Sequence, residues 1–311
     1  MAALLLVAAA LLSQLDIRLA SSQAISIVAR QTPDKVPLDD PLASVWDGVT
    51  PVQIPLSAQN AVVPNGGGSI RAVSVRSLTD GKRMYFRLEW DDQTQNTSAF
   101  APQEFRDAAA IEFPANGVST TPSFCMGQAN ANVNIWHWKA DWQADIDHGF
   151  VGVPQAYPDA GSDALPFRQF YSGKDAGNPL SQENRATPVE DLVAAGFGTL
   201  THAEAQNVQG KGVWQDGKWY VLFARDMEES QRDLYVPFED GQTTNVAFAV
   251  WDGANNERDG LKSVSQFADL QIEKEADPTN VTSLVVLGVL GALGLAGFFY
   301  LLYQERWKKQ V

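Results

Sequence analysis

The chain has 311 residues, of which 45% are hydrophobic and 19% charged, and its formal net charge at pH 7 is -14. This composition is typical of a globular protein with additional apolar segments. The negative charge disfavours nucleic acid as a partner, because its phosphates would be repelled. The single cysteine excludes an intramolecular disulfide and an iron–sulfur cluster held by several thiolates. A c-type haem is also excluded, because no C-x-x-C-H motif is present.

Residues 1–24 form an apolar N-terminal segment that we predict to be a secretory signal peptide. Its uncharged run, residues 2–12, is too short to span a bilayer but suits the central region of a signal. Ser22 and Ala24 are small residues that suit a cleavage site, although no lysine or arginine precedes the apolar run. The alternative is a buried helix at the start of the folded domain.

Residues 25–275 form the predicted folded domain, and their patterns are those of β-strands. Apolar and polar residues alternate through residues 84–90, and residues 219–226 and 245–252 show the same pattern. An Asp216-Gly217 pair between two strand-like runs predicts a β-hairpin. Helical periodicity is scarce, and residues 188–195 are the segment that we predict as a short helix. The expected fold is therefore mainly β, an antiparallel β-sandwich with few short helices.

Residues 149–204 differ from the rest of this domain, because they are rich in proline, glycine and aspartate and follow no clear period. We interpret them as a long insertion between strands of the sandwich. Insertions of this kind often carry function or face a partner.

A second apolar segment lies near the C-terminus, after a predicted linker of residues 276–283. Residues 284–303 carry no charge over about 20 positions, which is long enough for a helix to span a bilayer. The tail, residues 304–311, contains one arginine and two lysines, whereas acidic residues precede the segment. The positive-inside rule then places the tail in the cytoplasm and the folded domain on the extracytoplasmic, periplasmic side. We expect a single-pass membrane protein.

Residues 122–142 read PSFCMGQANANVNIWHWKADW and contain the cysteine, a methionine and three tryptophans. Pro122 and Gly127 flank a predicted turn that carries Met126. The strand-like run that follows alternates His137 on one face with Trp136 and Trp138 on the other. Both faces are bulky, so we expect one to be buried and the other covered by a large flat ligand or a partner. The alternative is a core strand with packed tryptophans and a loop methionine.

FCMG followed by VNIWHWKADW resembles the haem-binding gamma subunit of the ethylbenzene dehydrogenase branch of the DMSO reductase family of molybdenum enzymes, a cytochrome c-552/DMSO reductase-like domain. Residues 80–96, 104–114 and 211–227 resemble the same family, so the resemblance covers roughly residues 70–272. It implies one non-covalent haem b whose iron is held by a methionine and a lysine. The methionine corresponds to Met126, and the lysine to Lys211 with Lys218 as the alternative.

This ligand pair predicts an electron carrier. A thioether is a soft ligand that raises the haem reduction potential, and an amine binds iron only after losing its proton. Gly210 and Gly212 on either side of Lys211 suggest a backbone that approaches something flat. Two strong axial ligands leave no open position at the iron, and no motif of a hydrolase, P-loop enzyme, zinc protease or dinucleotide enzyme occurs. We therefore expect a protein that is not itself an enzyme.

Other residues of the same region are candidates for contacts with the haem. Trp136 and Trp138 are predicted to pack on the porphyrin, with ordinary core packing as the alternative. Lys139 and Arg225 are candidate partners of the propionates, with solvated charges as the alternative. If the tryptophan face lines the haem, His137 on the opposite face of the strand points away from it. The three histidines therefore have predicted roles in packing or at the surface, and they are His137, His148 and His202.

Together these features predict a membrane-anchored b-type cytochrome that serves as the electron-transfer subunit of an oxidoreductase complex. Its expected partners are a molybdopterin catalytic subunit, an iron–sulfur subunit, and a quinone or cytochrome c electron carrier. A first alternative is a haem b carrier of another respiratory chain. A second is a membrane-tethered glycan-binding sandwich whose tryptophans stack on sugar rings.

Overall fold

The computed structural model describes residues 25–118, 120–152, 172–228 and 234–274, together with residues 294, 296 and 297. The predicted signal peptide, linker and tail lie outside these residues. Of the predicted span, residues 284–303, the structure describes residues 294, 296 and 297. Among the described residues, none of the helices has the length and apolar character needed to cross a bilayer.

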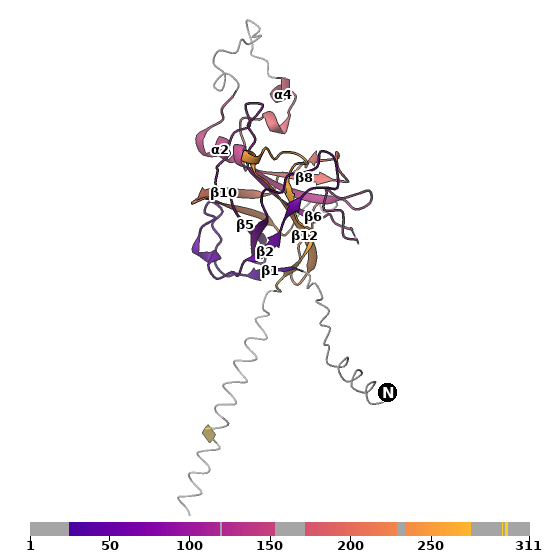
Figure 1. Ribbon diagram of the computed structural model, residues 1–311. Coiled ribbons are helices and arrows are strands. Elements are labelled where there is room, and N and C mark those ends of the chain that lie inside the picture. The colour runs from indigo at the N-terminus through magenta and orange to yellow at the C-terminus, as the bar shows by residue number, and fades with distance from the viewer. Residues whose placement is uncertain are drawn as a thin grey trace, which may run out of the picture.

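Strands dominate the part of the chain that the structure describes (Figure 1). The helical elements are short: α2 (Ala140–His148), α4 (Ser172–Asp175), η1 (Ser44–Trp46), η2 (Pro179–Ser181) and η3 (Gly253–Asn255). The strands are β1 (Ser26–Gln31), β2 (Val52–Pro55), β3 (Ser57–Ala58), β4 (Ala72–Thr79), β5 (Arg83–Asp91), β6 (Ala108–Pro114), β7 (Val133–Lys139), β8 (Val189–Ala194), β9 (Thr201–His202), β10 (Gln209–Gln215), β11 (Lys218–Asp226), β12 (Thr243–Trp251), β13 (Ser263–Val264) and β14 (Ala268–Ile272).

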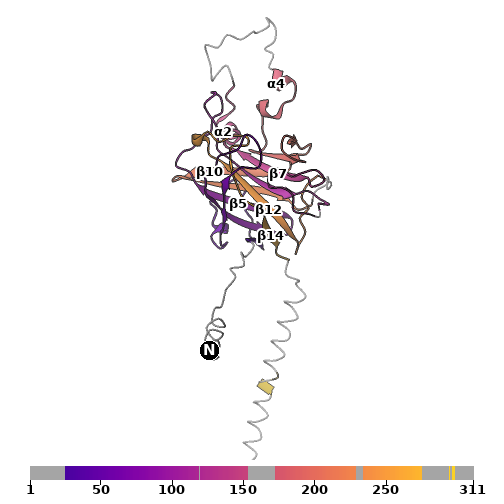
Figure 2. The ribbon, with the colours of Figure 1, turned by 45° about the vertical axis from the view of Figure 1, so that its right-hand side comes forward.

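The strands form two halves of a sandwich that share β12 (Figure 2). One half has the order β10-β11-β5-β4-β1-β14, and the other has the order β12-β6-β7-β8-β9. Residues 243–246 of β12 pair with β14, whereas residues 247–251 pair with β6. The mainly β prediction is confirmed. The expectation of a wholly antiparallel sheet is wrong, because β1 pairs in parallel with both β4 and β14.

Aromatic side chains fill the space between the halves. Trp136 of β7 lies 5.9 Å from Phe86 of β5 between ring centroids, and Trp138 lies 6.3 Å from Trp90 and 4.9 Å from Trp219. Both tryptophans of β7 have no exposed surface. Edge-to-face contacts of this kind add to the large apolar burial of each ring. The aromatic face of β7 therefore belongs to the core of the domain.

Local signals predicted some elements and missed others. The predicted hairpin is present as β10 and β11, and its turn residues Asp216 and Gly217 both have positive φ, at 54° and 74°. The predicted helix at residues 188–195 is wrong, because β8 pairs along β7 and most of its residues are buried. Strand pairing and burial outweigh the weak helical preference of this segment. Helix α2, which begins directly after β7, was not predicted.

Gly212 of β10 lies against a flat group, as its sequence suggested, but that group is the indole of Trp138. A Cβ atom at Gly212 would lie 2.2 Å from Cζ2 of this ring. We expect Gly212→Ala to lower the free energy of unfolding by about 1–3 kcal/mol, because extra volume in a packed core forces side chains or backbone to shift. Guanidinium unfolding of the purified protein measures the change. Gly48→Ala is the control, because nothing lies within 4 Å of its Cβ position. Equal stability of the two variants would contradict the assignment.

Candidate functional site

A cavity of about 430 Å³ lies on the outer face of the half formed by β12, β6, β7 and β8. Its floor contains Ala108 and Ala110 of β6 and Ala247 and Ala249 of β12, and Ala249 lies directly opposite Ala110. Methyl side chains at four neighbouring positions leave a low, flat surface. The volume lies in the range of pockets that hold small ligands and cofactors.

Loops from four parts of the chain form the walls of this cavity. Most of their side chains are apolar or aromatic, and two arginines and one lysine are also present. The residues of these walls include Phe105, Arg106, Phe124, Met126, Phe197, Leu200, Arg258 and Lys262. An apolar cavity with a few charged groups suits a large, mostly apolar ligand that carries charged substituents.

Met126 occupies the predicted turn between β6 and β7 and lines the cavity. Its φ of 66° lies in the left-handed region, which is uncommon for a side chain other than glycine, asparagine or aspartate. Two hydrogen bonds hold this backbone: the Met126 N–H donates to Glu112 Oε2 at 3.2 Å, and its carbonyl accepts from the Gly196 N–H at 2.8 Å. Such strained conformations persist where the surrounding structure fixes them, often at functional sites.

Lys262 lines the same cavity, and sequence reasoning missed it. Only 7% of the residue is exposed, and its Nζ lies 5.0 Å from the centroid of the Trp251 ring. The backbone N–H of Lys262 donates to the Gly66 carbonyl at 3.2 Å, and the backbone carbonyl of Lys262 accepts from the Gln59 N–H at 3.1 Å. Among the described residues, no carboxylate forms an ion pair with it. Burial lowers the pKa of Lys262, which favours the neutral amine, although the nearby Glu112 carboxylate opposes this effect.

Glu112 and His137 complete the polar part of the floor. Burial raises the pKa of Glu112, and its Oε1 accepts no hydrogen bond. His137 stacks on Trp251 with ring centroids 4.8 Å apart, and its buried Nε2 has no hydrogen-bond partner. Burial lowers the pKa of His137 well below 6.5, so the ring is neutral. Besides carboxylates such as Glu112, the cavity residues offer three sulfur or nitrogen atoms that could bind a metal: the Met126 sulfur, the Lys262 amine and the His137 Nε2.

Comparison with known proteins assigns the chain to a family. A family model described as "Ethylbenzene dehydrogenase" matches residues 43–263, which is more than half of the chain. The chain belongs to the ethylbenzene dehydrogenase family. The resemblance inferred from residues 122–142 is thereby confirmed, and the matched region of the family includes Met126, Lys211 and Lys262.

Curated relatives support this assignment. A Haloferax mediterranei protein, provisionally named as a respiratory nitrate reductase heme subunit, is 28% identical and covers 78% of this chain and 69% of its own. The chlorate reductase subunit gamma of Ideonella dechloratans is 27% identical, with coverages of 72% and 75%. The dimethylsulfide dehydrogenase subunit gamma of Rhodovulum sulfidophilum is 29% identical, with coverages of 73% and 72%. A solved family 9 carbohydrate-binding module from Caldicellulosiruptor kristjanssonii in complex with glucose has a TM-score of 0.43 at 8% identity, and the match covers 81% of this chain and 97% of that one.

The structure does not bring Lys211 together with Met126. Lys211 lies on β10, in the other half of the sandwich, and its Nζ donates to Asp147 Oδ1 at 2.7 Å. Lys218 pairs with the exposed Asp91 at 3.0 Å. Neither lysine lines the cavity. Both ammonium groups have carboxylate partners near the surface, outside the cavity that Met126 lines.

The other predicted contacts of the haem also lie elsewhere. Trp136 and Trp138 are buried in the core and do not line this cavity, whereas His137 does. Lys139 is buried, with its ammonium group bonded to Glu190 and lying 3.9 Å from the centroid of Trp142. Arg225 donates internally to Asn134 Oδ1 at 3.1 Å and to the Val236 carbonyl. Arg106 and Arg258 are the arginines that line the cavity.

The contribution of the buried Lys139–Glu190 ion pair to the stability of the fold can be tested. We expect Lys139→Ala to lower the free energy of unfolding by about 3–5 kcal/mol, because it leaves a buried carboxylate without its ammonium partner. Lys211→Ala removes a partly exposed ion pair and should cost less than about 1 kcal/mol. Guanidinium unfolding of both variants in parallel gives the two values. A small effect of Lys139→Ala would mean that the pair contributes little to the fold.

Proposed function

We propose that the chain is a haem b electron-transfer subunit whose cavity binds one haem, with Met126 and Lys262 as the residues that would hold its iron. The observation that carries this proposal is that both side chains line one alanine-floored cavity, and that the lysine is buried without a carboxylate partner among the described residues. Lys262 therefore replaces Lys211 as the lysine implied by the family resemblance.

The residues of the cavity fit a haem in three respects. The alanine floor offers a flat, apolar surface, and aromatic residues stand around it. Burial holds the Lys262 amine toward its neutral form, and the neutral amine is the form that binds iron. Arg258, and Arg106 in addition to its ion pair with Asp141 at 3.1 Å, offer charged partners for the propionate groups. A bound haem would supply one-electron chemistry, and a thioether from Met126 would favour its reduced state.

His137 provides the competing assignment, because its free Nε2 also lies in the cavity. Imidazole is a common haem ligand, whereas its stacking on Trp251 gives the ring a packing role. The variants described below separate these roles. We favour packing, since the strained backbone at Met126 and the doubly held backbone at Lys262 mark those two positions as fixed.

The names of the relatives support a place in a molybdoenzyme complex. We infer a partnership with a molybdopterin catalytic subunit and an iron–sulfur subunit, and electron exchange with a quinone or a cytochrome c carrier. The chain itself would carry electrons without catalysing the substrate reaction. A haem carrier of another respiratory chain is the remaining alternative, and co-purification of a molybdenum subunit separates the two. Burial of Trp136 and Trp138 removes from the glycan-binding alternative the tryptophans of residues 122–142 that would have stacked on sugars.

Absorption spectra of single variants test the ligands. We expect Met126→Ala and Lys262→Ala each to abolish the low-spin, six-coordinate spectrum, because one strong axial ligand is lost. Met126→Ala should also lower the reduction potential by on the order of 100 mV, because axial ligands set haem potentials over a wide range. Lys211→Ala and Lys218→Ala are matched controls and should leave the spectrum unchanged.

The same experiment distinguishes the alternatives. A change in ligation in His137→Phe with none in Lys262→Ala would assign the site to the histidine. In the native protein, rapid carbon monoxide binding would contradict a saturated iron and an electron-carrying role. Slow carbon monoxide binding would support a saturated iron, and fast electron exchange with the iron–sulfur subunit would support an electron-carrying role.

We further propose that residues 284–303 anchor the domain on the extracytoplasmic side of the membrane, after the signal peptide of residues 1–24 has directed its export. A chain ending before Thr282 should be soluble and should keep its haem spectrum, because an anchoring helix contributes membrane affinity and not core packing. Fractionation and absorption spectroscopy of the truncated protein measure both properties. Misfolding or loss of haem would show that the terminal segment belongs to the domain.

A further inference from the structure

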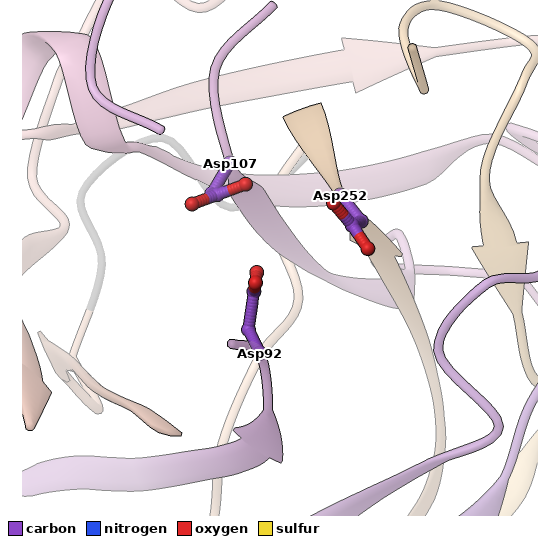
Figure 3. Close-up of side chains that lie close together, drawn as sticks. All are labelled: Asp92, Asp107 and Asp252. Carbon is purple, nitrogen blue, oxygen red and sulfur yellow. The ribbon is translucent and has the colours of Figure 1, made fainter. Parts of the chain in front are cut away.

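Three aspartates meet at one end of the sandwich, and two of them directly follow cavity residues in the chain, Asp107 after Arg106 and Asp252 after Trp251. Asp92 follows β5, Asp107 precedes β6 and Asp252 follows β12 (Figure 3). They are 5%, 0% and 6% exposed, and one carboxylate oxygen from each lies within 4.8 Å of the others. Three carboxylates so close together and away from water repel one another strongly when ionised, unless something compensates their charge.

Protein groups compensate only part of this charge. Asp107 accepts from the Asn96 and Gly253 N–H groups, at 2.7 and 2.9 Å, and from Trp219 Nε1 at 3.0 Å. Asp92 Oδ1 accepts from the Thr94 N–H and hydroxyl, both at 3.0 Å. Asp252 Oδ2 accepts from the Asn255 amide at 2.6 Å. These donors are neutral, and no lysine or arginine of the described residues forms an ion pair with any of the three aspartates.

A second observation points to a missing ligand. Asp92 Oδ2 is buried and has no hydrogen-bond partner. Figure 3 shows the Asp92 side chain directed at the space between Asp107 and Asp252. The Trp90 indole lies near enough to lower the pKa of Asp92, but its N–H does not meet this oxygen in hydrogen-bonding geometry. Burial nevertheless raises the pKa of Asp92, and burial together with Asp92 raises the pKa of Asp107 to about 7.

We propose that Asp92, Asp107 and Asp252 bind a divalent cation, Ca²⁺ in preference to Mg²⁺. The donors are all oxygens, which suits hard cations and disfavours Zn²⁺, whose usual protein ligands are nitrogen and sulfur. Mg²⁺ usually keeps several waters and is bound through one or two carboxylates, whereas Ca²⁺ accepts more oxygen ligands from the protein. Three buried carboxylates therefore suit Ca²⁺ better.

The bound ion would join the two halves of the sandwich at this end. Asp92 belongs to the half that contains β5, and Asp107 and Asp252 belong to the half that contains β6 and β12. The segment after Asp252 is held by Glu257, whose Oε2 accepts from the Asp252 N–H at 3.2 Å and whose Oε1 accepts from the Ser69 N–H at 2.9 Å. This segment continues to Lys262. The cation site stands on the aspartates alone and does not depend on the proposed haem.

The test uses the full chain, purified in mild detergent and stripped with EGTA. Isothermal titration calorimetry with CaCl₂ should show one equivalent of Ca²⁺ bound per chain. The same titration with MgCl₂ should show at least tenfold weaker binding of Mg²⁺. At Ca²⁺ one hundred times above its Kd, the Tm should rise by about 5–10 °C. Tb³⁺ should bind at the same place and show luminescence excited through tryptophan, because the Trp219 indole donates to Asp107.

Asp92→Asn is the matched variant, since it keeps an oxygen acceptor for Thr94 and removes the charge. It should weaken Ca²⁺ binding by at least tenfold, whereas Asp91→Asn, at the neighbouring exposed position, should bind as the wild type does. Equal Ca²⁺ affinity in wild type and Asp92→Asn would overturn the proposal. If Asp92→Asn fails to fold, the wild-type titration decides: the absence of Ca²⁺ binding and of any Tm shift would overturn the site. The absorption spectrum of the same wild-type samples reports on the haem separately.

Discussion

The packing of β7 against the opposite half of the sandwich determines the character of both its faces. Neighbouring side chains of a strand point in opposite directions, so placing Trp136 and Trp138 in the core places His137 outside. On β6 the same rule buries Ile111 and turns Ala110 outward. Alternation therefore decides which residues face the cavity, and on β6 these are the small residues Ala108 and Ala110.

Burial and pairing give three lysines three different chemistries. Lys211 is partly exposed and forms an ion pair with Asp147 near the surface. Lys139 is buried and paired with Glu190, and this pairing satisfies its charge inside the protein. Lys262 is buried beside an aromatic ring without an ion pair among the described residues, and burial lowers the pKa of this amine. The same side chain is therefore a partner in a surface ion pair, a partner in a buried ion pair, or a buried amine without an ion pair, according to its surroundings.

The sequence predicts the parts of this arrangement that depend on short-range pattern. Alternation, the Asp-Gly hairpin and the turn at Met126 are local features, and each is present. Lys262 has no local mark, because it follows an Asp-Gly pair and resembles a solvated loop lysine. Its burial depends on contacts with Gln59, Gly66 and Glu112, which lie far from it in the chain. The parallel pairing of β1 and the strand character of β8 likewise depend on distant partners.

Strand β12 has a further consequence for how the domain comes apart. Its first residues hydrogen-bond to β14 in one half, and its last residues hydrogen-bond to β6 in the other. Neither half can detach without breaking the ladder of a strand that also contributes Ala247 and Ala249 to the cavity floor. The domain should therefore melt as one cooperative unit, without an intermediate in which one half is folded and the other is not. A cofactor bound on this floor would be released in the same transition.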